Sequence, residues 1–585
     1  MQQQIRNKLK ELYPEITDNL IQLQKTKTDF EGDVTLVVFP LLRITKKNPE
    51  ESGKVIGEFL KKEISFVTGF NVVKGFLNLE ISSDYWLNKF QDILNIENYG
   101  VAEKTDKTYI VEFSSPNTNK PLHLGHLRNI FLGYSVANIL KANGHDVVKT
   151  QIINDRGIHI CKSMLAWQLF GNNETPESSG LKGDKLVGKY YVIFDQKYKE
   201  EIKQLIEAGE EKEKAEKEAS ILLKAQEMLK KWEEGEEEVV KLWGMMNSWV
   251  YKGFDVTYDT MGVDFDSLYY ESDTYILGKD IVESGLEKGV LYKKEDGSVW
   301  CDLSSEKMDD KLLLRGDGTS VYMTQDVGTA VKRFEDYPKT VGMIYTVGNE
   351  QEHHFKVLFT ILKKLGYSFA DECFHLSYGM VNLPTGKMKS REGTVVDADD
   401  LMAEVIQDAK NTTEERGQIE SLNPDQLEEL FAQIGLGGLK YYLLKVDPKK
   451  SMMFNPAESI DLNGNTGPFI QYTFARTQSI VNKQRGEVSQ LNLNTEVEKS
   501  EVDIIKHLLD LPEMIQEAGK SYSPALVANY TYDLVKLYNS FYQSVSIFKE
   551  EDQSKQNVRL LLTEKVAKTV RFTMSLMGIE VPSKM

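Results

Sequence analysis

Two histidines, His123 and His126, stand three residues apart in the segment PNTNKPLHLGHLR. At this spacing both imidazoles project from one side of a helical turn. Gly125 between them lets a ligand approach the backbone closely. A helix N-terminus favours phosphate, and two imidazoles beside it can stabilise a reacting nucleotide triphosphate without a covalent intermediate. The alternative is that both histidines only cap the start of a helix.

The elements around this motif predict how it is positioned. Tyr109–Ser115 alternates like a strand, residues 125–143 read as a helix, and Asp146–Ile153 reads as a second strand. Strand, loop, helix and strand within about 45 residues form a βαβ unit. Such a unit usually begins a doubly wound parallel sheet.

Composition limits the class of protein. The 585 residues allow about three to four domains at roughly 150 residues each. With 41% hydrophobic and 27% charged residues, disorder throughout is excluded. The net charge of −18 excludes a uniformly basic nucleic-acid coat but permits local basic patches.

Targeting and redox signals are few. The start, MQQQIRNKLKELYPEI, has no apolar core of a signal peptide, and no run of about 18 apolar residues predicts a membrane span. Three cysteines without a CxxC pair argue against a disulfide framework or a cysteine zinc site. We therefore expect a cytoplasmic protein.

Three further regions have distinct patterns. Residues 1–100 predict a small α/β domain, with a helix over about 2–24, an apolar run at Val34–Arg43 and a strand at Gly75–Ser82. Residues 197–238 are rich in Lys and Glu and predict a solvated helical hairpin. From about residue 425 to Met585 the pattern is entirely helical.

The HLGH segment resembles the signature of class I aminoacyl-tRNA synthetases, and SSPN-x-x-KP-x-H-x-GHLR is similar to the version in arginyl-tRNA synthetases. Further blocks carry the same resemblance along the chain: DFEGDVTLVVFPLLRITKKNP, GFLN, GDKLVGKYYVIF, ESDTYILGK, SVYMTQDVGTA, NTGPFIQYTFARTQSI and MGIEVPSKM. The resemblance implies a multidomain α/β protein. Its parts would be a tRNA-contacting α/β domain at 1–100, a Rossmann-like catalytic domain at 101–424 with a helical insertion around 197–250, and a helical anticodon-binding domain at 425–585.

The family's reaction joins L-arginine to ATP as arginyl-adenylate and transfers the arginyl group to the 3′ end of tRNA(Arg). Mg²⁺ is expected on the phosphates, and no structural metal is expected, because the HHF triplet at 353–355 lacks further ligands at zinc spacing. The resemblance assigns ATP binding and catalysis to the following residues: Lys120, His123, Gly125, His126, Lys387, Lys389 and Arg391.

The second ATP motif of the family, KMSKS, is altered here. The matching stretch is GKMKSREGTVV, with Ser390 in place of the fourth-position lysine. In arginyl enzymes with such loops a lysine just before the histidine motif is held to compensate, and Lys120 matches it. The sequence does not rank Lys120 against Lys387 and Lys389, and a solvated basic loop is the alternative.

Selective binding of arginine needs buried acceptors, because a guanidinium carries five donors in a planar fork. By resemblance, Tyr322 and Asp326 hold the guanidinium from one helical face and Glu271 adds a carboxylate. Asn117 lies near the amino acid's α-amino and carboxylate end. Glu112 and Gln351 complete the predicted pocket.

With a negative net charge overall, the chain must bind tRNA through local cations and aromatic rings. Candidates are Arg476, Tyr530, Tyr538, Tyr542 and Met585, although tyrosines at helical spacing more often belong to a core. The resemblance implies that activation needs bound tRNA. We expect a monomer that binds neither DNA nor a membrane.

Two other functions remain open from the sequence. The HxGH motif also occurs in small-molecule nucleotidyltransferases, but these lack a helical RNA-binding region such as 425–585. A non-catalytic tRNA-binding paralogue is the other, favoured only by the imperfect KMKSR stretch.

Overall fold

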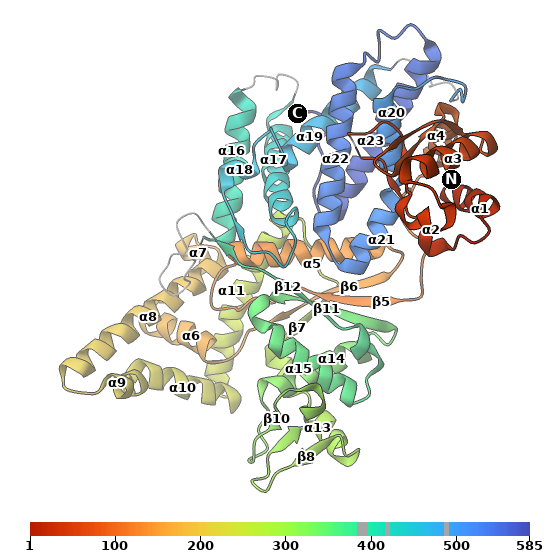
Figure 1. Ribbon diagram of the computed structural model, residues 1–585. Coiled ribbons are helices and arrows are strands. Elements are labelled where there is room, and N and C mark those ends of the chain that lie inside the picture. Colours follow the sequence, from red (N-terminus) through yellow and green to blue (C-terminus); the bar gives the residue numbers. More distant parts are fainter. Residues whose placement is uncertain (28, 383–395, 416–421, 485–490) are drawn as a thin grey trace. The chain divides into compact units, whose positions relative to one another are not determined.

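The computed structural model describes the chain from Met1 to Met585 except residues 28, 383–395, 416–421 and 485–490 (Figure 1). The chain divides into two compact units. The first comprises Met1–Tyr99, Thr477–Leu511 and Asp533–Thr569, and the second comprises Gly100–Arg476, Pro512–Tyr532 and Val570–Met585. Each unit therefore combines segments that are far apart in the sequence.

The first unit contains an antiparallel sheet in the order β1-β2-β4-β3. Its strands are β1 (Leu23–Lys25), β2 (Val34–Val37), β3 (Val67–Val73) and β4 (Phe76–Ile81). Its helices include α1 (Gln2–Leu12), α2 (Leu42–Thr45), α3 (Pro49–Glu63), α4 (Ser83–Leu94) and α20 (Lys499–Leu509). The Lys506 ammonium of α20 pairs with Asp33, which ties a C-terminal helix to the loop before β2.

One expectation in this unit is wrong. The helix predicted over about 2–24 ends at Leu12 and is followed by the 3₁₀ turn Asp18–Leu20 and by β1. Pro14 explains the early end, since a residue before proline avoids the helical region. The apolar run at Val34–Arg43 forms β2 over Val34–Val37 and then enters the 3₁₀ turn Phe39–Leu41, which contains Pro40 and leads into α2.

The second unit is built on a five-stranded sheet, β12-β11-β5-β6-β7, in which every pair is parallel. The strands are β5 (Thr108–Glu112), β6 (Asp146–Ile153), β7 (Ser267–Tyr270), β11 (Thr340–Gly348) and β12 (Phe374–Tyr378). This order is that of a Rossmann fold, so the predicted doubly wound sheet is confirmed. The order reverses between β5 and β11, and such a switch point opens a crevice at the carboxyl ends of the strands.

Helices cover both faces of this sheet (Figure 1). One face carries α5 (Leu124–Ala142), close to the predicted helix. The other carries α14 (Tyr322–Asp336) and α15 (Glu352–Lys364). Their apolar core extends to α13 (Lys279–Glu287) and to a small antiparallel sheet of β8 (Leu291–Lys293), β9 (Val299–Cys301) and β10 (Lys311–Leu314).

Between β6 and β7 the chain forms a helical arm that extends from the sheet (Figure 1). It consists of α6 (Ile158–Phe170), α7 (Pro176–Ser179), α8 (Gly183–Glu207), α9 (Lys212–Glu218), α10 (Ser220–Glu233) and α11 (Glu237–Met261). Ion pairs one turn apart run along it, such as Lys214–Glu210 at 2.8 Å. The helical reading of 197–238 is confirmed.

The remaining elements are helical, with one exception. They are α16 (Ala398–Glu415), α17 (Pro424–Leu444), α18 (Pro456–Ser459), α19 (Gly467–Lys483), α21 (Leu511–Ser521), α22 (Pro524–Ser544) and α23 (Gln553–Leu576). The all-helical expectation beyond 425 misses β14 (Met452–Met453), which pairs in parallel with β13 (Val381–Asn382). Across the described ranges no helix has the length and apolarity to cross a membrane.

Helix α5 sits directly against β5 because Gly133 has no side chain. A Cβ at this position would overlap the Cβ of Phe113, the residue that follows β5. We expect Gly133→Val to lower the free energy of unfolding by about 3 kcal/mol, as overpacking of a tight core does. Urea denaturation measures this change. Gly244→Ala in α11 is the control, because no atom lies within 4 Å of a Cβ there; equal stability of both variants would contradict the close packing.

Candidate active site at the carboxyl ends of the sheet

The two histidines of the HLGH segment close the N-terminus of α5. The His123 Nδ1 accepts the Gly125 N–H at 3.1 Å, and the His126 Nδ1 accepts the His123 N–H at 3.1 Å. The ring centroids are 3.9 Å apart. The two histidines therefore do cap the helix, as the alternative predicted. Capping uses only their Nδ1 atoms, so the Nε2 atoms can still contact a ligand.

Both imidazoles are neutral. Burial lowers the pKa of His123 to about 4, with a smaller contribution from Lys120. Burial also holds the pKa of His126 well below its ordinary value, with His123 and Lys120 acting in the same direction. Because Nδ1 accepts a hydrogen bond in each ring, the single proton lies on Nε2. Two Nε2–H donors thus stand at the N-terminus of a helix, where the helix dipole also favours phosphate oxygens.

A strained turn brings the chain from β5 to this helix. Ser114 and Ser115 both have positive φ, at 72° and 45°. The Ser114 N–H donates to Asn129 Oδ1 of α5 at 2.6 Å, and its hydroxyl lies 2.7 Å from the Tyr258 hydroxyl. Left-handed conformations of residues other than glycine cost of order 1 kcal/mol each. The surrounding hydrogen bonds hold this strain next to the histidines.

The HLGH backbone also pairs with the start of α16. The Leu124 N–H donates to the Val396 carbonyl at 3.2 Å, and the Ala398 N–H donates to the Leu122 carbonyl at 3.0 Å. Arg128, fully buried on α5, donates to the Gly379 carbonyl at 2.6 Å. The predicted residues Lys387, Lys389 and Arg391 lie outside the described residues.

A cluster of carboxylates forms across the crevice. Glu271 starts α12 (Glu271–Thr274) at the end of β7, and Asp326 lies on the first turns of α14. Burial raises the pKa of Glu271, Arg156 opposes this, and Asp155 and Asp326 add to it, so these carboxylates are near neighbours. The Asp326 carboxylate accepts a hydrogen bond from His354 Nε2 at 2.6 Å. Glycines allow this closeness: Gly278 after α12 and Gly328 of α14 would each overlap the other segment if they carried a Cβ.

The other predicted pocket residues differ in exposure. Tyr322 is 77% exposed at the start of α14, on the same helix as Asp326 as the spacing predicts. Gln351 and Asn117 are exposed; Gln351 follows β11, and Asn117 pairs with Asn154 at the end of β6. All three lie near the carboxyl ends of the strands.

Glu112 is the exception. It is buried, one carboxylate oxygen pairs with Arg333 of α14, and the other accepts the Ser115 hydroxyl at 3.2 Å. Arg333 itself stacks at 5.0 Å on the Tyr269 ring. Sequence reasoning missed this partner, because nothing in the local sequence around Arg333 signals burial of its guanidinium.

Sequence reasoning also missed Asp155. Its Oδ1 accepts the Ser272 N–H at 2.9 Å, and its Oδ2 accepts the Ser272 hydroxyl at 2.7 Å and the Tyr251 hydroxyl at 2.9 Å. Asp155 is 1% exposed, and it fixes the residue next to Glu271. Its place directly after β6, at a carboxyl edge, was a signal that could have found it.

The predicted tRNA-binding residues fall into two groups. Tyr530 and Tyr538 are buried, at 6% and 0% exposure, which favours the core alternative for both. Tyr542 is 39% exposed. Arg476 lies 5.1 Å from the Tyr472 ring, and Met585 packs partly buried against Leu430 and Ile434.

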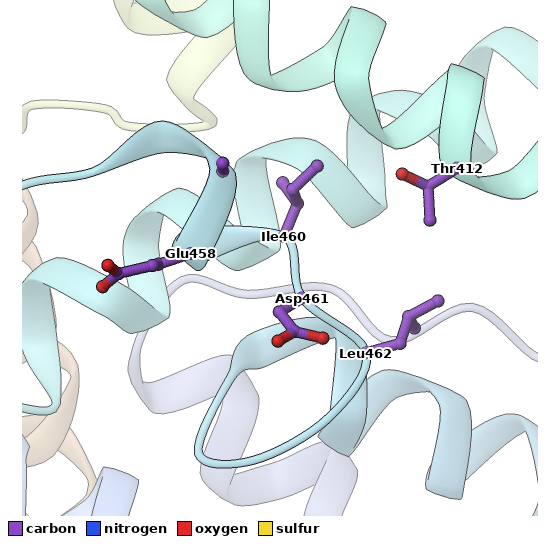
Figure 2. A pocket seen from close by; sticks show the side chains of 6 residues that line it. Thr412, Glu458, Ile460, Asp461 and Leu462 are labelled. Carbon is purple, nitrogen blue, oxygen red and sulfur yellow. The ribbon is translucent and has the colours of Figure 1, made fainter.

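A pocket of about 350 Å³ lies apart from these residues (Figure 2). It is lined by Thr412 of α16 and by Ala457, Glu458, Ile460, Asp461 and Leu462. In Figure 2 Glu458 and Thr412 lie at opposite ends of it. The Glu458 carboxylate is already bonded to Asn455 at 3.0 Å and to Tyr442 at 3.1 Å. None of the predicted site residues lines this pocket.

Comparison with known proteins agrees with this geometry. A model described as "tRNA synthetases class I (R), catalytic domain" matches residues 89–455, and one described as "DALR anticodon binding domain" matches residues 470–585. The fold and the histidine site are thus those of a class I aminoacyl-tRNA synthetase with a helical anticodon-binding domain.

Individual relatives narrow the family. The chain is 56% identical to an arginine–tRNA ligase of Flavobacterium psychrophilum over 98% of this chain and 97% of that one. It is 56% identical to one of Bacteroides thetaiotaomicron over 99% and 98%. The arginyl-tRNA synthetase structure from Thermus thermophilus shares the fold with a TM-score of 0.75 at 22% identity, covering 99% and 98%. The chain belongs to the arginyl-tRNA synthetases.

The tautomer of the two histidines can be tested directly. Burial disfavours the charged ring, so we expect both rings to stay neutral with the proton on Nε2 as the pH falls from 8 to 5.5. Nitrogen NMR of protein labelled in histidine reads the protonation of each ring nitrogen, and His123→Gln and His126→Gln assign the signals. Titration of either ring near its ordinary pKa would contradict the buried, bonded geometry.

Proposed function

We propose that the chain is an arginine–tRNA ligase that works in two steps at the carboxyl edge of its parallel sheet. The carboxylate of L-arginine attacks the α-phosphate of ATP, giving arginyl-adenylate and pyrophosphate. The arginyl group then moves to the 3′-terminal adenosine of tRNA(Arg), and AMP leaves. The observation that carries this proposal is the pair of neutral histidines on α5 with an acidic cluster at the same edge of one sheet.

The histidines act on the phosphates. Their Nε2–H groups donate to phosphate oxygens on which negative charge grows as the α-phosphate is attacked. Neutral donors suit this task, since they need no protonation at working pH. Gly125 leaves the His123 ring in its position, because a Cβ there would lie 3.0 Å from that ring.

Positive charge for the departing pyrophosphate comes from lysines in this proposal. Lys120 raises the local potential enough to help lower the pKa of both histidines. Lys387, Lys389 and Arg391 are proposed to add to it. Mg²⁺ would enter on the ATP phosphates; in the described part of the chain no group of three or more His, Cys, Asp or Glu is arranged to hold a metal.

The arginine pocket is assigned to the acidic cluster. Asp326 and Glu271 offer carboxylates to the guanidinium, and the exposed ring of Tyr322 lies on the same helix as Asp326. Asn117 and Gln351 face the α-amino and carboxylate end. We place Glu112 here as well; a carboxylate has about four acceptor positions, so its bonds to Arg333 and Ser115 leave some free.

The tRNA is proposed to contact residues 1–100 at its outer corner and the helical region 425–585 at its anticodon. Arg476, Tyr542 and Met585 are the better candidates, with Tyr530 and Tyr538 supporting them from the core. The catalytic region is 101–424. Because one chain carries every element of the reaction, we propose a monomer acting in the cytoplasm on tRNA(Arg), and not on DNA or membranes.

Charging of total tRNA with each of the twenty amino acids, ATP and Mg²⁺ tests the activity. We expect charging with arginine alone. Charging with another amino acid would overturn the pocket assignment. If folded protein binds tRNA but charges it with nothing, the chain is the non-catalytic paralogue.

Removing the Asp326 charge should weaken arginine binding. We expect Asp326→Asn to raise the KM for arginine by about tenfold to a hundredfold, since a hydrogen bond to a charged group contributes about 1.5–3 kcal/mol. The KM for ATP should stay within about twofold of wild type on the same reasoning. Pyrophosphate exchange with tRNA present measures both. Glu335→Gln, exposed on the same helix, is the control; an equal rise in both KM values for Asp326→Asn would remove it from the pocket.

Asp155 should affect arginine indirectly. Without its bonds to Ser272, the start of α12 and the Glu271 carboxylate shift, and we expect Asp155→Ala to raise the KM for arginine by about tenfold. Asp266→Asn is the control, because Asp266 bonds the Lys149 N–H before the opposite end of β7. An unchanged arginine KM in Asp155→Ala would show that α12 does not depend on this carboxylate.

A further inference from the structure

The first turns of α8 and α16 are joined by a cluster of charges. The Lys182 ammonium, at the N-cap of α8, pairs with Asp399 of α16 and lies 3.3 Å from Asp184. The Lys185 ammonium lies 2.7 Å from Asp400 and 3.3 Å from Asp397. Two lysines of the helical arm thus face three aspartates that begin α16.

Burial of the Asp184 carboxylate in this cluster lowers the stability of the folded protein. It is fully buried, and neither carboxylate oxygen makes a hydrogen bond of ordinary geometry with any described residue. Burial raises the pKa of Asp184 to about 6, with Lys182 opposing and Asp399 adding to the rise. Gly253 of α11 leaves the space for this carboxylate, since a Cβ there would overlap it. Buried carboxylates without hydrogen bonds reduce stability, so the cluster is not explained by stability alone.

The aspartates lead directly to the histidines. The Asp397 carboxylate accepts the Asp399 N–H at 2.9 Å and the Asp400 N–H at 3.2 Å, and so caps α16. The Asp397 backbone forms a β-bridge with His123. A displacement of the first turn of α16 would therefore also displace His123, whose Nδ1 caps α5.

Helix α8 reaches the same segment a second way. A Cβ at Gly188 would lie 2.8 Å from Pro121 Cδ and 3.6 Å from Lys120 Cα. The histidine segment thus contacts both α8 and the start of α16, and the two lysines join these helices to each other.

We propose that Lys182 and Lys185 are positioning residues for adenylate formation, which hold the first turn of α16 and, through its bridge to His123, set the two imidazoles against the phosphates. This inference rests on the proposed function of the histidines. Neither lysine touches substrate. Their effect falls on the activation step, because the β-bridge from Asp397 leads to His123. Asp399 also accepts the Thr257 hydroxyl of α11 at 2.9 Å, which holds it in place from a third helix.

The experiment uses Lys185→Met in the full-length protein, with pyrophosphate exchange measured in the presence of tRNA(Arg). We expect kcat to fall about tenfold from a small displacement of the histidines, with the KM for arginine unchanged. Lys185→Arg should restore most of the rate. Lys189→Met is the matched control. Lys189 lies one turn further along α8 and pairs with Glu174 at 2.8 Å, and among the described residues it forms no ion pair with α16; the kcat of this variant should equal that of wild type.

A double-mutant cycle separates positioning from a general loss of stability. The single variant Asp400→Asn should also lower kcat. The double variant Lys185→Met/Asp400→Asn should have a kcat no lower than that of the slower single variant, because both changes break the same ion pair. Thermal melting of each variant is measured alongside. A wild-type kcat in Lys185→Met, or a loss of kcat that tracks the melting temperature equally in Lys189→Met, would overturn the proposal.

A second readout does not depend on activity. Nitrogen NMR of the His123 and His126 rings should change in Lys185→Met and stay unchanged in Lys189→Met. Unchanged ring signals in both variants would contradict the coupling even if the wild-type protein failed to charge tRNA. Wild-type charging in the same series reports on the proposed function separately.

Discussion

The structure depends on how the N-terminus of one buried helix is closed. The first amides of α5 need acceptors, and the chain supplies them from the Nδ1 atoms of His123 and His126. That choice fixes the tautomer of both rings and directs the Nε2–H groups away from the helix. Capping therefore leaves both Nε2–H groups for the phosphate contacts proposed above. The turn at Ser114 and Ser115, with two positive φ angles, leads the chain away from β5 toward this helix.

The charges around the crevice fit the two ligands of the proposed function. Asp155, Glu271 and Asp326 lie on the proposed arginine side, and the neutral imidazoles and Lys120 lie on the proposed nucleotide side. Glu112, between them in the sheet, is balanced internally by Arg333. An excess of negative charge over the whole chain, −18, is compatible with tRNA binding because association depends on the local field at the contact surface.

The helical arm is more than a solvated insertion. Its outer helices carry exposed ion pairs, which contribute little to stability. Its base differs: Lys182 and Lys185 of α8 meet the aspartates that begin α16, and Gly188 packs against Pro121. The same helix is a surface element at one end and a support of the histidine segment at the other.

The sequence determined the local features of this protein. The apolar periods predicted β5, α5 and β6 and hence the doubly wound sheet, and the spacing of His123 and His126 predicted one helical turn, because these features depend on neighbours in the chain. The helix over 2–24 failed at Pro14, where turn chemistry outweighs composition. Only the tertiary structure paired Glu112 with Arg333, bonded Asp155 beside Glu271, buried Tyr538 and joined α8 to α16. Each of these contacts links residues more than 20 positions apart in the sequence, and long-range packing leaves no periodic trace in either partner's local sequence.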